Sequence, residues 1–330
     1  MSTHPAPDDR SAGTRAPTSA TTGGSTGGST GSEGSPVANG VLAALATPLT
    51  EDGALDHGGL ARLVHHILGS GASGICPAGS TGEGPLLSRA LRTELTAAVV
   101  SLAPPSTPVI PATVSLTPTD TLADLDAYAE AGATAALVPP PFYYPLSEAS
   151  IFRFFDEVAE RSPIPLLLYN IPAMTKVVLP VRVVSELAAH PRVVGMKDSS
   201  RDLEYFQSAA VATRRHHFSL LTGSDTLLVA SMAAGAAGTI AASVNLVPAL
   251  VVNLYRAILD GEDEAARTLQ ERLIGIVLAC RRPGFPAGWK AALALHQLCG
   301  ATVAPPLVPA TSEATRVLAD ELAPFIAGSD

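Results

Sequence analysis

The chain has 330 residues and a net charge of −9, and 47% of its residues are hydrophobic, which is enough apolar material for a sizeable core. The acidic balance and the lack of a Lys/Arg-rich block exclude a nucleic-acid or anionic-membrane footprint, so the expected partner is a small molecule or another copy of the chain. The three cysteines are an odd number without CxxC spacing, which argues against a disulfide framework or a zinc site and fits a reducing cytoplasm.

Residues 1–38 consist almost entirely of Ser, Thr, Gly, Pro, Ala and charged residues. A segment with so little apolar surface cannot offset the entropy that it loses on ordering, so we predict a disordered tail. The segment also lacks the continuous apolar stretch of a signal peptide. No uninterrupted apolar run elsewhere reaches the roughly 18 residues of a membrane helix. We therefore expect a cytoplasmic protein without a membrane span.

From residue 41 onward the chain repeats a short apolar run, a turn and an amphipathic stretch. The alternation predicts parallel strands joined by right-handed helical crossovers. The runs are apolar throughout, as expected for strands that are covered on both faces of a sheet. The eight predicted strands are VLAALATP (41–48), SGICPAGS (73–80), PVIPATVS (108–115), AALVPPPF (135–142), IPLLLYNIP (164–172), VVGMKDSS (193–200), FSLLTGSD (218–225) and GTIAASVN (238–245).

Amphipathic stretches with capping residues or acidic first turns follow each run. Eight strand–helix units in a span of this size predict an α/β fold, a (β/α)8 TIM barrel over residues 39–262, since such barrels take about 250 residues. Residues 263–330 are predicted to form a C-terminal helical extension packed on the barrel. An open doubly wound sheet or a two-lobed binding protein remains the alternative, because periodicity does not show whether a sheet closes. The predicted helices are 56–71, 88–103, 117–133, 147–162, 180–191, 202–216, 225–235, 248–262, 263–281, 286–300 and 312–326.

In a barrel the carboxyl ends of the strands converge on one pocket, which makes Lys197 and Tyr169 candidate catalytic residues. Lys197 comes directly after Met196 at the end of a run. Burial there favours the neutral amine, the form that attacks a ketone. Tyr169 ends the preceding run, and its phenol can transfer a proton in the same mouth. The alternatives are a solvated lysine paired with Asp198 and a core tyrosine.

The GSTGEG loop, residues 79–84, offers backbone N–H groups and two hydroxyls, a combination that suits a carboxylate or phosphate. A plain loop is the equal alternative. The adjacent pairs His65–His66 and His216–His217 have no carboxylate at ligand spacing, so we expect no metal site. A G-x-S-x-G nucleophile elbow is missing as well. The residue set favours amine chemistry.

The segments GSTGEG, PPFYYP, LLYNIP and GMKDSS, in that order at the ends of the second, fourth, fifth and sixth runs, resemble the class I pyruvate-dependent aldolases of the dihydrodipicolinate synthase and N-acetylneuraminate lyase superfamily. The resemblance covers everything but the tail. It implies that Lys197 forms a Schiff base with a 2-oxo acid and that Tyr169 is the general acid and base. It also implies that Ser80 and Thr81 hold the carboxylate of the 2-oxo acid and relay protons.

The resemblance assigns further roles. Tyr144, a further candidate catalytic residue, matches the second tyrosine of a pair that, in the synthase branch, reaches the site of a neighbouring subunit. Ile240 matches a residue whose carbonyl orients the intermediate, and Asp225 matches an aspartate near substrate hydroxyls. Gly79, in the GSTGEG segment, and Thr47, at the end of the first run, complete the candidate substrate-binding residues. The family needs no metal or organic cofactor, and the resemblance implies a homotetramer.

Two residues after YNIP the synthase branch has an arginine that binds the carboxylate of the second substrate, whereas this chain has Met174. Lys176 is the nearby cation that would partly compensate. We therefore predict reversible cleavage of a 2-oxo acid, of the 2-keto-3-deoxy sugar acid type, to pyruvate and an aldehyde. A dehydratase that uses the same imine, 4-hydroxy-tetrahydrodipicolinate synthase and a non-catalytic sugar- or acid-binding protein are the alternatives.

Overall fold

The structure is a computed structural model that describes residues 38–326. The predicted tail, residues 1–38, lies outside this range except for Ala38, which is buried. None of the helices in residues 38–326 combines the length and the hydrophobicity that a membrane span requires.

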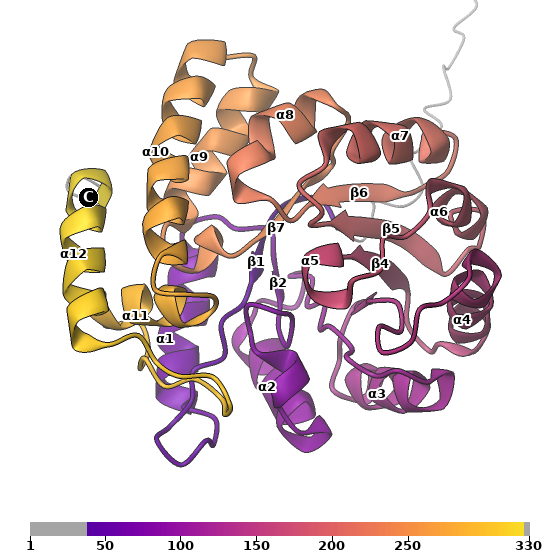
Figure 1. Cartoon of the computed structure of the whole chain (residues 1–330), viewed down its shortest axis with the longest axis horizontal. Coiled ribbons are helices and arrows are strands. Elements are labelled where there is room, and N and C mark those ends of the chain that lie inside the picture. The colour runs from indigo at the N-terminus through magenta and orange to yellow at the C-terminus, as the bar shows by residue number, and fades with distance from the viewer. Residues whose placement is uncertain (1–37, 327–330) are drawn as a thin grey trace, which may run out of the picture. The chain divides into compact units, whose positions relative to one another are not determined.

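The centre of the fold is a parallel sheet of seven strands in the order β2-β1-β7-β6-β5-β4-β3 (Figure 1). Neighbouring strands in this order pair in parallel, as the alternation of strands and helices predicts. The strands are β1 (Gly40–Ala44), β2 (Gly74–Cys76), β3 (Ala136–Val138), β4 (Leu166–Asn170), β5 (Val193–Asp198), β6 (Ser219–Thr222) and β7 (Gly238–Ala241).

The eighth position of the barrel, between β2 and β3, is filled by residues 108–113. This segment forms only isolated bridges to Ile75 of β2 and Leu137 of β3, instead of the regular strand predicted over 108–115. The N–H of Leu137 donates to the carbonyl of Pro111 at 2.9 Å. Pro108 and Pro111 have no N–H to donate, so a continuous ladder of hydrogen bonds cannot form. The segment nevertheless closes the sheet, which confirms the (β/α)8 barrel and excludes the open sheet.

The helices lie around the outside of the sheet (Figure 1). Five of them begin after an Asp, Ser or Thr side chain that accepts a hydrogen bond from a backbone N–H of the first turn, a favourable N-cap. Each predicted barrel helix is present, and the short α5, which directly follows β4, is an addition. The barrel helices are α1 (His57–Gly69), α2 (Arg89–Leu102), α3 (Pro118–Glu130), α4 (Glu148–Arg161), α5 (Pro172–Thr175), α6 (Val181–Leu187), α7 (Leu203–Thr213), α8 (Leu228–Ala233) and α9 (Pro248–Leu259).

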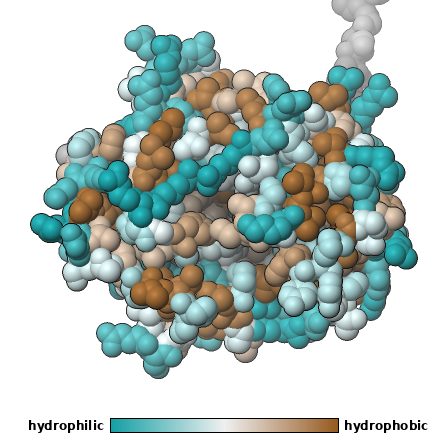
Figure 2. Space-filling view, in the orientation of Figure 1, coloured by the Kyte–Doolittle hydropathy of each residue, from teal (hydrophilic) through white to brown (hydrophobic). Residues whose placement is uncertain are grey.

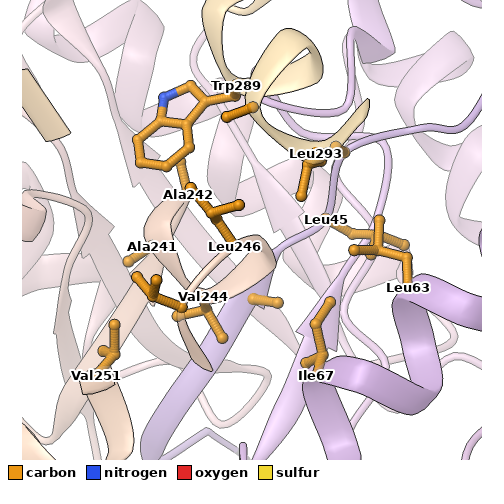
Figure 3. Packing of buried hydrophobic residues seen from close by; sticks show 14 of the residues in the cluster. Leu45, Leu63, Ile67, Ala241, Ala242, Val244, Leu246, Val251, Trp289 and Leu293 are labelled. Atoms are coloured by element: carbon orange, nitrogen blue, oxygen red, sulfur yellow. The ribbon is translucent and has the colours of Figure 1, made fainter. Parts of the chain in front are cut away.

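Three further helices pack on one side of the barrel: α10 (Asp263–Arg281), α11 (Ala287–Leu295) and α12 (Ser312–Ile326). Trp289 and Leu293 of α11 belong to the same hydrophobic cluster as Leu63 of α1 and Ala242 after β7 (Figure 3). The C-terminal helices therefore share a core with the barrel. This shared core holds Trp289 close to the carboxyl ends of the strands.

A separate apolar cluster fills the inside of the barrel. Its members come from alternate positions of several strands, as expected where successive side chains point to opposite faces of a strand. Tyr169 of β4 and Ile240 of β7 belong to it, so two of the predicted site residues close the top of this inner layer. Cys76 also lies in it, and burial raises the pKa of its thiol to about 11.

Candidate active site

Lys197 and Tyr169 lie side by side on neighbouring strands. β4 and β5 pair in a register that sets Tyr169 opposite Lys197, so both side chains point to the same face of the sheet. Both residues are only 4% exposed. Lys197 Nζ donates to the Tyr169 hydroxyl at 3.4 Å and lies 4.6 Å from the centre of the tyrosine ring. The structure therefore brings the two candidate catalytic groups into contact through a long hydrogen bond.

Asp198 points away from Lys197, because successive residues of a strand face opposite sides. Its carboxylate accepts hydrogen bonds from Asn170 Nδ2 at 2.7 Å and from the Ser200 hydroxyl at 2.9 Å. Burial raises the pKa of Asp198, although these hydrogen bonds oppose the effect. Among residues 38–326 no carboxylate lies within ion-pair distance of Lys197. The alternative of a solvated lysine paired with Asp198 is wrong.

The GSTGEG loop follows β2 and brings Ser80 to the same place. Ser80 Oγ lies 3.4 Å from the Tyr169 hydroxyl, so Lys197, Tyr169 and Ser80 form a continuous chain of polar groups. Thr47 is fully buried and donates to the carbonyl of Gly82 at 2.6 Å. A Cβ atom at Gly84 would lie 1.7 Å from the carbonyl oxygen of Ala78, so this position of the loop needs glycine. Thr47 thus holds the loop and does not line the cavity.

A cavity of about 160 Å³ contains the reacting groups. Six predicted residues line it: Lys197, Tyr169, Ser80, Thr81, Asp225 and Ile240. The lining also includes side chains that the sequence analysis did not predict, namely Ser199, Arg201, Arg281, Phe285 and Trp289. Figure 2 shows the face seen in Figure 1, with hydrophilic side chains along the border of a recess near its middle.

A second, more apolar cavity of about 250 Å³ adjoins the first and shares four lining residues with it, Ser80, Tyr169, Ile171 and Met174. Gly79, a predicted binding residue, lines this second cavity. Thr113 also lines it, and its buried hydroxyl has no hydrogen-bond partner among the described residues. The two cavities together give a bound molecule room on both sides of Tyr169.

Asp225 lines the same cavity as Arg201 and Arg281, and both its carboxylate and its carbonyl accept hydrogen bonds. Its carboxylate accepts a hydrogen bond from the backbone N–H of Ser243 at 2.9 Å, and its carbonyl accepts one from Gln270 Nε2 at 3.0 Å. Burial and the nearby charge of Arg201 lower the pKa of Arg281, and the negative charge of Asp225 opposes this effect. The charges of Arg201 and Asp225 therefore both act on the guanidinium group of Arg281, in opposite directions.

Tyr144 lies apart from this cavity within the single chain. Its side chain is 71% exposed, and its ring packs edge-to-face on Tyr143 with ring centroids 5.0 Å apart. Both rings line a surface pocket of about 580 Å³ that also includes Arg153. The structure of one chain therefore does not bring Tyr144 to Lys197.

Met174, which stands where the synthase branch has an arginine, is 53% exposed and lies between the two cavities. Lys176 does not line either of these cavities. Its ammonium group donates instead to the carbonyl of Ala173 at 2.8 Å, at the end of α5. The expectation that Lys176 supplies the missing cation is therefore wrong.

Within residues 38–326, neither histidine pair of the sequence belongs to a group of side chains that could bind a metal ion. His66 Nε2 lies 3.3 Å from the carbonyl oxygen of Leu246, and burial lowers the pKa of this ring. Within the part of the chain that the structure describes, no group of three or more His, Cys, Asp or Glu residues is placed to hold a metal ion.

Gly223 sets the position of the Lys197 side chain. A Cβ atom at Gly223 would lie 2.8 Å from Lys197 Cε and 2.0 Å from Ser199 Oγ. We expect Gly223→Ala to displace the amine and to slow by about 10²-fold the borohydride trapping of pyruvate that the family resemblance implies for Lys197, because a misplacement of about 1 Å has effects of that size. Gly69→Ala, at a site with no atom within 4 Å of the new Cβ, is the matched control. Equal trapping rates in the two variants would contradict this role of Gly223.

Comparison with known proteins identifies the family of the chain. The sequence profile of the Dihydrodipicolinate synthetase family matches residues 37–324. A 4-hydroxy-tetrahydrodipicolinate synthase of Gluconacetobacter diazotrophicus is 33% identical over 270 residues, which cover 82% of this chain and 91% of that protein. The enzyme of the same name from Methanothrix thermoacetophila is 33% identical over 86% of this chain and 95% of its own length.

Solved structures give the same result. YagE, a prophage protein of E. coli from the dihydrodipicolinic acid synthase family, was solved in complex with pyruvate and superposes with a TM-score of 0.83 at 28% identity, covering 87% of this chain and 98% of that one. Dihydrodipicolinate synthase from Bacteroides thetaiotaomicron superposes with a TM-score of 0.83 at 30% identity, covering 87% and 98%. The chain therefore belongs to the dihydrodipicolinate synthetase family, whose members are pyruvate-dependent carbon–carbon lyases of the class I aldolase type.

Proposed function

We propose that the chain forms an imine between Lys197 and a 2-oxo acid and reversibly cleaves a substrate of the 2-keto-3-deoxy sugar acid type to pyruvate and an aldehyde. The observation that carries the proposal is the buried Lys197–Tyr169 pair, with Nζ 3.4 Å from the phenol oxygen and no carboxylate beside the amine among residues 38–326. Such an amine has no ion-pair partner to lose before it attacks a carbonyl.

The chemistry follows from these contacts. The neutral amine of Lys197 attacks the keto carbon, and Tyr169 passes a proton to the carbinolamine oxygen, which leaves as water. The protonated imine then accepts the electron pair of the C3–C4 bond while Tyr169 takes the proton of the C4 hydroxyl. The aldehyde leaves, the enamine is protonated at C3, and water hydrolyses the imine to release pyruvate. Ser80, 3.4 Å from the phenol, relays these protons.

The remaining roles follow the resemblance to the family. Ser80 and Thr81 hold the carboxylate of the 2-oxo acid, together with the N–H groups of the loop around Gly79. The carbonyl of Ile240 orients the intermediate, and Asp225 contacts substrate hydroxyls. Tyr144 contributes only in a homotetramer, through the site of a neighbouring subunit, and a cytoplasmic location is part of the same proposal. The family uses no metal cofactor.

The second candidate is 4-hydroxy-tetrahydrodipicolinate synthase, which is the name of both relatives at 33% identity. This candidate requires a site for an aldehyde that bears a carboxylate. Met174 stands at the position of the arginine that binds this carboxylate in the synthase branch, and Lys176 is engaged elsewhere. We therefore prefer cleavage of a 2-keto-3-deoxy sugar acid.

The test is borohydride reduction in the presence of pyruvate, followed by intact-mass measurement and peptide mapping. A pyruvyl adduct on Lys197 supports the imine. Product analysis with a set of 2-keto-3-deoxy sugar acids then separates the reactions. Release of pyruvate identifies the aldolase, loss of water without pyruvate identifies a dehydratase, and consumption of pyruvate with a carboxylate-bearing aldehyde identifies the synthase. An adduct on another residue, or none, would overturn the proposal.

Tyr169→Phe tests the proton-transfer step separately. The variant keeps the ring and the amine, so pyruvate trapping on Lys197 should remain detectable. Turnover should fall by about 10²–10⁴-fold, the usual loss when a general acid and base is removed. Tyr255→Phe is the matched control, because the hydroxyl of Tyr255 lies outside the cavity, 3.4 Å from the carbonyl oxygen of Ala237. An unchanged kcat in Tyr169→Phe would exclude Tyr169 as the proton carrier.

A further inference from the structure

Two arginines from distant parts of the sequence line the cavity that contains Lys197. Arg201 follows β5, three residues after Asp198, and Arg281 is the last residue of α10. Arg201 is exposed in the single chain and Arg281 is half-buried. Neither has a hydrogen-bond or ion-pair partner within the described range 38–326. Two guanidinium groups thus face one cavity without a protein anion bound to them.

Arg201 has an unusual backbone conformation, and Arg281 differs in its contacts from the next arginine in the sequence. Arg201 has a φ of 64°, in the left-handed region that residues other than glycine rarely adopt. Arg282, the next residue after Arg281, forms an ion pair with Glu321 of α12 at 2.7 Å and does not line the cavity. Neighbouring arginines at the end of α10 therefore serve different purposes, one structural and one at the cavity.

The charge of the cavity is not balanced. When a 2-oxo acid is bound, the charged groups that the protein brings to the cavity are the protonated imine on Lys197, the guanidinium groups of Arg201 and Arg281, and one carboxylate, Asp225. Asp225 is already held by the N–H of Ser243. Asp225 offsets one of the three positive charges, and the carboxylate of a bound 2-oxo acid offsets a second. One positive charge in the cavity therefore remains without a negative partner. Guanidinium groups bind carboxylates and phosphates through paired hydrogen bonds of fixed geometry.

We propose that Arg201 and Arg281 bind a second anionic group, a carboxylate or a phosphate, at the end of the 2-oxo acid that is furthest from the imine. This inference rests on the proposed function and narrows its substrate class to 2-keto-3-deoxy sugar acids with a second negative charge. The pair comes from the end of β5 and the end of α10, on other elements than Met174, which lies in α5.

The test compares three 2-keto-3-deoxy sugar acids of equal chain length that end in a primary alcohol, a carboxylate or a phosphate. In the wild-type protein, kcat/KM for at least one charged substrate should exceed that for the alcohol by about 10- to 100-fold, the effect of a hydrogen bond to a charged group. The better of the two charged substrates identifies the group. Arg201→Met and Arg281→Met should each remove most of this preference, so that kcat/KM falls about 10-fold more for the charged substrate than for the alcohol.

Arg282→Met is the matched control, because it removes a charge from the same helix end and should keep the wild-type preference. Trapping of pyruvate on Lys197 should be unchanged in all three variants, which shows that they fold and that neither arginine holds the first carboxylate.

Equal use of all three substrates by the wild type would overturn the inference while the Lys197 adduct still supports the aldolase. A loss of activity that is equal for alcohol and anion in Arg201→Met and Arg281→Met would overturn it as well. Failure of the adduct itself refutes the proposed function.

Discussion

Replacement of Lys197 by arginine is expected to abolish the pyruvate adduct and to lower kcat/KM by on the order of 10⁴-fold or more, as for other nucleophiles that carry a covalent step. The guanidinium group stays protonated at any pH at which the protein is folded, so it has no free electron pair with which to attack the keto carbon. Lys197 is also tightly enclosed, at 4% exposure, between the Tyr169 ring and Gly223. The measurement is reductive trapping with pyruvate, read by intact mass, together with pyruvate release.

Lys176→Arg is the matched control for this prediction. Lys176 is an exposed lysine after the neighbouring strand, and its ammonium group donates to the carbonyl of Ala173, a bond that arginine also makes. We expect the control to keep its adduct and its activity. Persistent trapping in Lys197→Arg would mean that another amine forms the imine, and the assignment of the reaction centre would then be wrong.

Most of the fold is predictable from the sequence because strands and helices in this chain differ in length, in apolar pattern and in capping. The third predicted strand, residues 108–115, is the exception. Its residues lie where the barrel requires a strand, but Pro108 and Pro111 cannot donate hydrogen bonds, so only isolated bridges form. An apolar run therefore predicts the place of a strand more reliably than its hydrogen bonding.

The pairing of Lys197 with Tyr169 is predictable because it depends on local facts. Each residue ends an apolar run, neighbouring runs form neighbouring strands, and the carboxyl ends of parallel strands meet on one side of a barrel. The alternative partner, Asp198, is excluded by the same local reasoning once the alternation of side chains along β5 is considered.

Arg281 and Trp289 could not be predicted as cavity residues. They lie on helices that follow the barrel in the sequence. The apolar periodicity of these helices does not indicate which end of the barrel they cover. Arg201 offered a weak signal, since it comes directly after the KDSS segment at a strand end. Lys176 shows the opposite error: it is near the site in sequence, but the left-handed turn after α5 directs its ammonium group to a backbone carbonyl.

Replacement of Lys290 by methionine is expected to destabilise the protein by about 3–5 kcal/mol, the usual effect when one member of a buried ion pair is removed. Lys290 of α11 and Glu83 of the GSTGEG loop are both fully buried, and Lys290 Nζ lies 2.8 Å from Glu83 Oε1. The second carboxylate oxygen accepts a hydrogen bond from the N–H of Ala304, and Lys290 donates to the carbonyl of Thr302. Without the lysine, a buried carboxylate remains with no positive charge beside it. Urea unfolding followed by circular dichroism measures the change.

The pair also connects stability with catalysis, because Glu83 lies in the loop that brings Ser80 to Tyr169. We expect Lys290→Met to lower kcat/KM in the folded protein, and the double variant Glu83→Gln with Lys290→Met to recover much of the lost stability, since a neutral amide oxygen still accepts from Ala304. Arg182→Met is the control: Arg182 is 67% exposed and pairs with Glu148, so its loss should cost less than about 1 kcal/mol. A similar small loss in Lys290→Met would show that this buried pair does not hold the loop in place.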